Sequence, residues 1–175
     1  MITKAEIIDQ PYSGQYKERI YDVISPWNSQ SWTWVKFENE DFTEWCGEFR
    51  GAPRAVALSK KYNKVLVLTS DYLFQMDCLS GEVIEYESHH LYQSLTVTPS
   101  GEFIIADDYS IEKIESNIND KTLLESPLEM IDMIKFTGWF NNKLSITCKE
   151  SINWDNNFLL ELDGDTLGIT SKDCT

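Results

Sequence analysis

The hydrophobic and polar positions of residues 51–87 predict four short strands in succession. The segments are 55–59, 64–69, 72–77 and 82–87, and turn-forming residues separate them. The second segment contains a continuous apolar run, typical of a strand buried on both faces, whereas the fourth is charged at three of its six positions. The apolar signal therefore falls from an inner strand to a solvated edge, as it does across one blade of a β-propeller or at one end of a meander.

The same order of strands and turns returns further along the chain. Residues 94–114 repeat strand, turn, strand, acidic turn and strand, and Asp71-Tyr72 corresponds to Asp108-Tyr109 at a spacing of 37 residues. A third, partial copy covers residues 158–163. A period of about 40 residues filled with short strands is the pattern of blade-like repeats.

Two further hairpins flank these repeats. Residues 31–50 form one across the turn 39–41, and residues 133–148 form another across Asn141-Asn142, a dipeptide that tolerates positive φ. Residues 116–126 are polar and predict a loop. Four of the six tryptophans fall within residues 27–45, a density that favours a role in the core.

The whole pattern predicts an all-β protein of about ten to thirteen short strands. Its antiparallel repeats are propeller-like, as a partial or small propeller, or else form a meander or sandwich. We expect a single domain over residues 1–175, with β repeats from residue 31 onward. Residues 1–30 contain either one short helix, over residues 15–24, or an extended arm that wraps the sheet.

The formal net charge is −14, from 29 acidic and 15 basic residues. Such a surface repels phosphates, so we expect neither nucleic acid nor an anionic membrane as a partner. It attracts a basic protein, a polyamine or a metal cation, and it accelerates encounter with a basic partner. The alternative is that the charge serves solubility alone.

Cysteine spacing and hydropathy indicate the cellular compartment that we expect for the protein. The four cysteines lie far apart without a CxxC pair, which indicates neither a zinc site nor a disulfide framework. No segment has the apolar length of a signal peptide or a membrane span. We therefore expect a cytoplasmic protein with reduced thiols, without a cofactor or a bound metal.

Candidate catalytic chemistry is sparse. The two histidines, His89 and His90, are adjacent, so on a strand they point to opposite faces, and a solvated connector is the favoured interpretation. The chain contains no GxSxG, HExxH or GxxxxGK[ST] motif. The sequence therefore predicts a protein that is not an enzyme.

Three aspartates, Asp71, Asp107 and Asp108, recur at equivalent turns between predicted strands. We expect them to cluster at one end of the sheet, where Asp side chains most often satisfy turn amides. The functional alternative is a carbohydrate-active or small-ligand-binding domain that uses these turn carboxylates, with raised carboxyl pKa values in a pocket.

Carboxylates interleaved with aromatic residues suggest an interaction surface. One group surrounds the turn at 39–41, next to Phe37, Phe42 and Trp45, and another lines the strand 82–87 with Tyr86. Such groups pair with Lys and Arg of a partner while the rings supply anchors, although a solvated face is the alternative. The candidate partner-binding residues are Glu38, Glu40, Asp41, Glu44, Asp71, Tyr72, Glu82, Glu85, Asp107, Asp108 and Tyr109.

One resemblance adds to this interpretation. Residues 34–37, 45–53, 65–74 and 80–83 (WVKF, WCGEFRGAP, VLVLTSDYLF and SGEV) resemble bacterial immunity proteins of contact-dependent inhibition and related polymorphic toxin systems, over residues 31–115. The resemblance implies a cytoplasmic monomer that binds one basic toxin domain, commonly a nuclease, in a 1:1 complex and covers its active site or substrate groove. Interfaces in this family differ from pair to pair, so no binding residue carries over. The carboxylates would stand where nucleic acid phosphates sit on the toxin.

Overall fold

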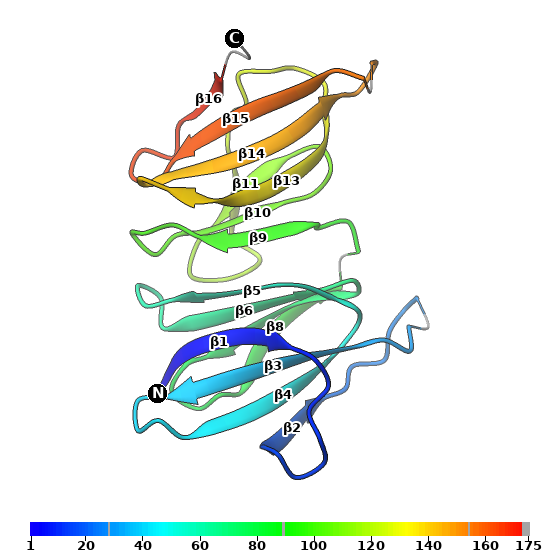
Figure 1. Cartoon of the computed structure of the whole chain (residues 1–175), viewed down its shortest axis with the longest axis vertical. Coiled ribbons are helices and arrows are strands. Elements are labelled where there is room, and N and C mark those ends of the chain that lie inside the picture. The colour runs from blue at the N-terminus through cyan, green and yellow to red at the C-terminus, as the bar shows by residue number, and fades with distance from the viewer. Residues whose placement is uncertain (28, 89, 154, 173–175) are drawn as a thin grey trace. The chain divides into compact units, whose positions relative to one another are not determined.

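The computed structural model describes residues 1–27, 29–88, 90–153 and 155–172, and the strands it contains are shown in Figure 1. The described residues form sixteen strands in four four-stranded sheets, with no helix among them. The all-β, propeller-like fold class predicted from the pattern is confirmed. The chain divides into two compact units, residues 1–90 and 91–175, where the sequence predicted a single domain.

The first unit holds two sheets of four strands. One has the order β1-β3-β4-β2, and the other has the order β5-β6-β7-β8. All strand pairs are antiparallel except β2 with β4, which are parallel. The strands are β1 (Ile2–Ile8), β2 (Lys17–Tyr21), β3 (Trp32–Asn39), β4 (Glu44–Arg50), β5 (Pro53–Ser59), β6 (Lys64–Thr69), β7 (Tyr72–Asp77) and β8 (Val83–Ser88).

The second unit also holds two sheets, and both are simple antiparallel meanders. Their orders are β12-β11-β10-β9 and β13-β14-β15-β16. The strands are β9 (Ser94–Val97), β10 (Phe103–Ala106), β11 (Ile111–Ile114), β12 (Lys121–Leu123), β13 (Ile131–Phe140), β14 (Lys143–Glu150), β15 (Asn157–Asp163) and β16 (Ile169–Lys172).

The strand repeat predicted from the sequence is present in the structure. Strands β5 to β8 coincide with the four predicted segments to within two residues, and Val65 to Leu68 are buried as expected. β15 is the third strand of its sheet, as β7 is of its own, which explains why residues 158–163 match 72–77. The hairpin at Asn141-Asn142 is also confirmed, with both residues at positive φ (48° and 63°).

The N-terminal segment and the polar loop differ from the prediction. Residues 17–21 form β2, so the short helix is wrong and the extended alternative holds for them. Residues 2–8 form β1, and β12 lies inside the predicted loop 116–126. β2 and β12 escape a local pattern because each is short and largely polar, and each gains its stability from a neighbouring strand of its sheet. The parallel partner of β2 is also distant in sequence.

The tryptophans contribute less to the core than predicted. Only Trp45 of the four in residues 27–45 is buried, whereas Trp32 and Trp34 are half-buried and Trp27 is exposed. In β3 the inward side chains are Thr33, Val35 and Phe37, one position out of phase with Trp32 and Trp34. The Arg50 guanidinium covers Trp32 at 3.9 Å from the ring centroid, which gives this outward ring a cation–π contact.

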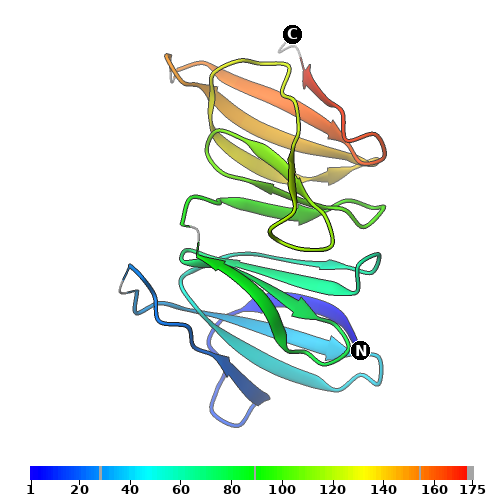
Figure 2. The same ribbon diagram turned by 180° about the vertical axis from the view of Figure 1, so that it is seen from behind.

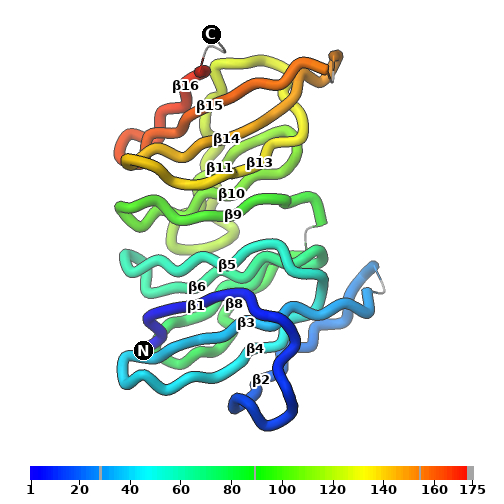
Figure 3. Tube along the Cα trace, in the orientation of Figure 1, coloured from blue at the N-terminus to red at the C-terminus, as the bar shows by residue number. Residues whose placement is uncertain are grey.

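Each unit has its own apolar core, built where its two sheets pack face to face. In the first unit Val35, Phe37 and Phe49 of one sheet pack with Val67 and Phe74 of the other. In the second unit, β10 and β11 supply Ile104 and Ile111, which pack with Ile146, Leu160 and Leu162 of the other sheet. The Cα trace in Figure 3 shows the path of the chain through both sheets of each unit.

Candidate functional site

The turn between β3 and β4 presents an aromatic side chain to solvent. Phe42 is 81% exposed and has φ 61°, a left-handed conformation that bulky residues rarely adopt. Its backbone N–H donates to the Asn39 carbonyl at 2.9 Å, which closes the turn. The Asp41 carboxylate accepts hydrogen bonds from the Thr43 hydroxyl at 2.6 Å and the Thr43 N–H at 3.1 Å. These bonds fix the turn and lower the pKa of Asp41.

Carboxylates surround Phe42 at this turn, although cations of the same unit contact some of them. Lys4 pairs with Glu38 at 2.9 Å, and the Glu38 side chain is only 18% exposed. Lys36 lies 3.5 Å from Glu44, which stays exposed. Surface pairs of this kind contribute about 0–1 kcal/mol and leave the carboxylates able to exchange partners. We call Glu40, Asp41, Phe42 and Glu44 the hairpin tip.

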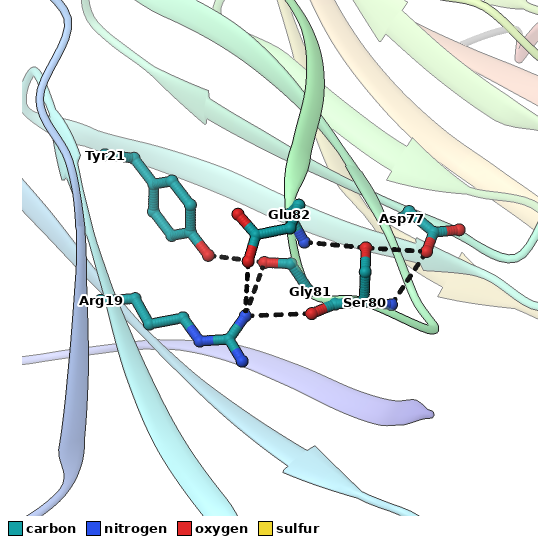
Figure 4. A network of polar contacts seen from close by, with 6 residues as sticks. All are labelled: Arg19, Tyr21, Asp77, Ser80, Gly81 and Glu82. Carbon is teal, nitrogen blue, oxygen red and sulfur yellow. Dashed lines mark hydrogen bonds and ion pairs between the residues drawn. The ribbon is translucent and has the colours of Figure 1, made fainter.

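The turn between β7 and β8 contains a network of polar contacts (Figure 4). Arg19 donates to the carbonyls of Ser80 at 3.0 Å and Gly81 at 3.2 Å, and pairs with Glu82 at 3.4 Å. Tyr21 donates its hydroxyl proton to the Gly81 carbonyl at 2.5 Å. Both donors come from β2, so this network ties β2 to the other sheet of the unit.

A polar cavity of about 310 Å³ lies between these two turns. Glu40 and Asp41 line it from one side, and Arg19, Ser80 and Trp45 line it from the other. The Arg19 guanidinium also stacks on Trp45, at 4.5 Å from the ring centroid. The structure therefore brings the predicted acidic groups at 40–41 and 82 close to one cavity.

The Asp77 carboxylate is expected to make the β7–β8 turn sensitive to acid. Hydrogen bonds from the Ser80 N–H and hydroxyl, both 2.9 Å, hold the pKa of Asp77 below its usual 3.8. A depressed folded-state pKa stabilises the turn above pH 3.8, and this stability is lost as the pH falls through the folded pKa. We expect the Ser80 amide NMR signal to shift on acidification, whereas Asp77→Asn keeps the acceptor and removes the shift. A Ser80 signal that shifts on acidification to the same extent in the Asp77→Asn variant would contradict this.

Two predicted partner-binding residues, Asp71 and Tyr72, are buried instead. Asp71 accepts hydrogen bonds from Ser70 at 2.6 Å and from the Ser25 hydroxyl. The Tyr72 hydroxyl donates to the Ile24 carbonyl at 2.6 Å, and burial raises its pKa. Both side chains fasten residues 24–25 to the turn before β7, and neither is more than 3% exposed.

The other turn aspartates lie in the second unit, so the three aspartates do not share one sheet. Asp107 accepts from the N–H groups of Tyr109 at 2.8 Å and Ser110 at 2.7 Å, the structural role expected of a turn aspartate. Asp108 precedes Tyr109, whose ring is exposed and lines an apolar cavity of about 590 Å³ with Leu123, Met130 and other residues.

The structure also shows apolar residues near Glu85 that the sequence analysis missed. Glu85 and Tyr86 of β8 line a cavity opposite Ile20 of β2, and both Ile20 and Tyr86 are exposed. The sequence pattern placed Ile20 on the apolar face of a short helix, so its exposure beside Glu85 could not be predicted. In the structure, Ile20 lies on an edge strand.

Metal, thiol and membrane chemistry add little to the site. Across residues 1–27, 29–88, 90–153 and 155–172, no group of three or more His, Cys, Asp or Glu side chains is placed to hold a metal ion. Cys46 and Cys78 are buried and free, and burial raises the pKa of each to about 11.

His90 packs against Trp27 at 4.8 Å between ring centroids, and His89 lies outside the described residues. A helix of sufficient length and hydrophobicity to span a bilayer is not found in the described part of the chain.

Comparisons with known proteins give no family for the chain. No protein-family model matches it, and no curated protein matches it. Among solved structures it is similar to the N-terminal domain of Nup159, and to a chain in a complex of S. cerevisiae Dbp5 with Nup159, Gle1, IP6 and ADP. Each has a TM-score of 0.44 and 12% identity and covers 70% of this chain. The chain spans about a third (34%) of the length of these neighbours, and at this TM-score the likeness supports no functional conclusion.

Proposed function

We propose that this protein is a non-catalytic binding protein whose partner is a basic protein. In its specific form, it is an immunity protein that neutralises a toxin domain, with a nuclease as the favoured class. The observation that carries the proposal is the hairpin tip, where a strained and exposed Phe42 stands among Glu40, Asp41 and Glu44. Backbone strain of this kind persists where the surrounding structure enforces it, and it concentrates at functional positions.

The chemistry of the tip fits a basic protein surface. An exposed aromatic ring becomes an anchor once it is desolvated in a complex, and carboxylates around it pair with Lys or Arg. The net charge of −14 adds long-range attraction that raises the association rate. On a nuclease, the same carboxylates would occupy the positions of substrate phosphates, which accounts for inhibition without catalysis.

The test begins with capture of the tagged protein from its native cells, followed by identification of proteins that remain bound at low and then high salt. A basic toxin domain is the expected partner. The double variant Glu40→Lys with Glu44→Lys is then expected to lower the association rate at least about tenfold and to flatten its salt dependence. Asp41 is left in place because its hydrogen bonds to Thr43 hold the turn.

A matched control separates local contact from global charge. Glu129 and Asp155 are exposed residues of the second unit, and reversing both changes the net charge by the same amount. If this control slows association as much as the tip variant does, the tip is not the binding site. If no basic protein is recovered and purified nuclease toxins bind neither variant nor wild type, the proposed function is wrong.

Replacing Phe42 with glycine is expected to separate stability from binding. Glycine adopts φ 61° without the steric cost that a bulky side chain incurs, so the free energy of unfolding should rise by about 1 kcal/mol. Loss of the ring should weaken partner binding by about tenfold or more. Urea unfolding and titration with the captured partner measure the two effects. A glycine variant that binds as tightly as wild type would remove Phe42 from the interface.

A further inference from the structure

Two edge strands of the first unit line opposite sides of a groove. β2 is the last strand of one sheet and β8 is the last strand of the other. Two adjoining cavities, of about 400 Å³ and 580 Å³, lie between residues 20–26 and β8 and share Asp22, Val23 and Tyr86. Figure 2 shows this face of the unit, with β8 in green and β2 in blue. We call the two cavities together the β2–β8 groove.

The groove is held open by hydrogen bonds at both ends. At one end, Tyr21 donates to the Gly81 carbonyl at 2.5 Å. At the other end, Tyr72 donates to the Ile24 carbonyl at 2.6 Å, beside the contact between Ser25 and Asp71. Burial raises the pKa of both phenols, so both remain protonated donors at neutral pH. Residues 21–25 are therefore fixed opposite β8 before any ligand arrives, which lowers the entropic cost of binding.

The walls of the groove expose large apolar side chains. Ile24 is 92% exposed, Ile20 is 64% exposed and Tyr86 is 50% exposed. Ile84 of β8 is also exposed, and buried Phe74 lies beneath, 6.3 Å from Tyr86 between ring centroids. Single exposed apolar residues are ordinary, but a group gathered along one groove marks a binding surface.

Charge selects the occupant of this groove. The two charged residues that line the cavities, Asp22 and Glu85, are both acidic. Arg50 pairs with Asp22 at 2.6 Å and offsets its charge, so Glu85 carries most of the acidic character of the lining. Exposed Glu82 precedes β8 and extends the acidic rim. The groove is therefore complementary to a ligand that is both apolar and basic.

We propose that the β2–β8 groove binds an extended segment of another protein, which adds as a strand to the outer edge of β8. Among the described strands, β8 pairs with β7 alone, so its other edge is available for main-chain pairing. Side chains of an added strand alternate between two faces. A segment that alternates apolar with Lys or Arg residues places the apolar ones beside Ile84 and Tyr86 and the basic ones beside Glu85, which alternates with them along β8. This inference goes beyond the proposed function, because it concerns another surface and does not require a toxin.

A capped synthetic peptide of about ten residues that alternates valine and lysine is the probe. Titration followed by calorimetry and amide NMR of the full chain should show binding, with shifts in β8 and residues 20–24. A peptide with glutamate in place of lysine should bind at least about tenfold more weakly. A peptide N-methylated at every residue loses the main-chain donors of both of its edges and should not bind.

Two variants test the groove itself. Ile24→Ser removes an exposed apolar side chain while leaving the carbonyl that Tyr72 uses, and Glu85→Lys reverses a lining charge. Each should weaken peptide binding by about tenfold, whereas Tyr12→Ala, at an exposed residue outside the lining, should have no effect.

The hairpin-tip variant Glu40→Lys with Glu44→Lys should leave peptide binding unchanged, which distinguishes failure here from failure of the proposed function. The inference is overturned if the peptide does not bind at about 1 mM, or if the N-methylated peptide binds equally well.

Discussion

Replacing Phe49 with alanine should lower the free energy of unfolding by about 3–5 kcal/mol, the loss typical of a buried phenylalanine. Phe49 is fully buried and touches both sheets of the first unit. Its ring stacks on Tyr21 at 4.8 Å and packs against Phe74 at 5.3 Å. Urea unfolding followed by tryptophan fluorescence measures the loss.

Phe42→Ala is the matched control for this experiment, because Phe42 is exposed and its removal should change stability by less than about 0.5 kcal/mol. Since the Tyr21 ring rests on Phe49, the Phe49 variant should also weaken binding of the valine–lysine peptide. A loss of stability below about 1 kcal/mol would mean that the two sheets do not share this ring.

Replacing Gly51 with alanine should cost about 3 kcal/mol, although only one methyl group is added. Gly51 has φ +106°, and an added Cβ would lie 2.5 Å from the Thr69 hydroxyl oxygen and 2.8 Å from Thr69 Cβ. Thr69 is fully buried; its hydroxyl donates to the Arg50 carbonyl at 2.9 Å and accepts from the Tyr72 N–H at 3.0 Å. Movement of Thr69 would therefore disturb the turn that holds Asp71 and Tyr72.

Gly14 provides the control for Gly51. It also has positive φ, at +79°, but an added Cβ meets no atom within 4 Å. Gly14→Ala should therefore show only the backbone cost, about 1 kcal/mol. Thermal and urea unfolding of both variants measure the difference, and equal losses would show that contact with Thr69 is unimportant.

Much of the fold followed from local patterns because most strands pair with the next strand in the chain. β5 to β8 form such a meander, and the fall in apolar content from Val65 to Glu87 matched the passage from an inner strand to an edge. β2 could not be predicted in the same way. It joins β4 in parallel, and spacing within residues 17–21 carries no information about a partner in residues 44–50.

The candidate site was predicted only in part, for a related reason. Glu40, Asp41 and Glu44 were placed correctly at a turn, since turn residues are recognisable locally. Composition could not show that Asp71 and Tyr72 are buried, because Asp and Tyr occur both at surfaces and in hydrogen-bonded interiors. The β2–β8 groove depends on two edge strands coming together, which only the tertiary structure reveals.

The parallel pairing of β2 with β4 also affects how the protein is made. During synthesis β2 leaves the ribosome before β4 has been translated. Residues 17–21 therefore remain without their sheet partner while residues 22–50 are added. This unpaired segment carries three charged side chains, Lys17, Glu18 and Arg19. Their hydration disfavours pairing with other nascent chains. β2 is therefore among the last strands of its sheet to dock. The β2–β8 groove forms only after most of the first unit has been translated.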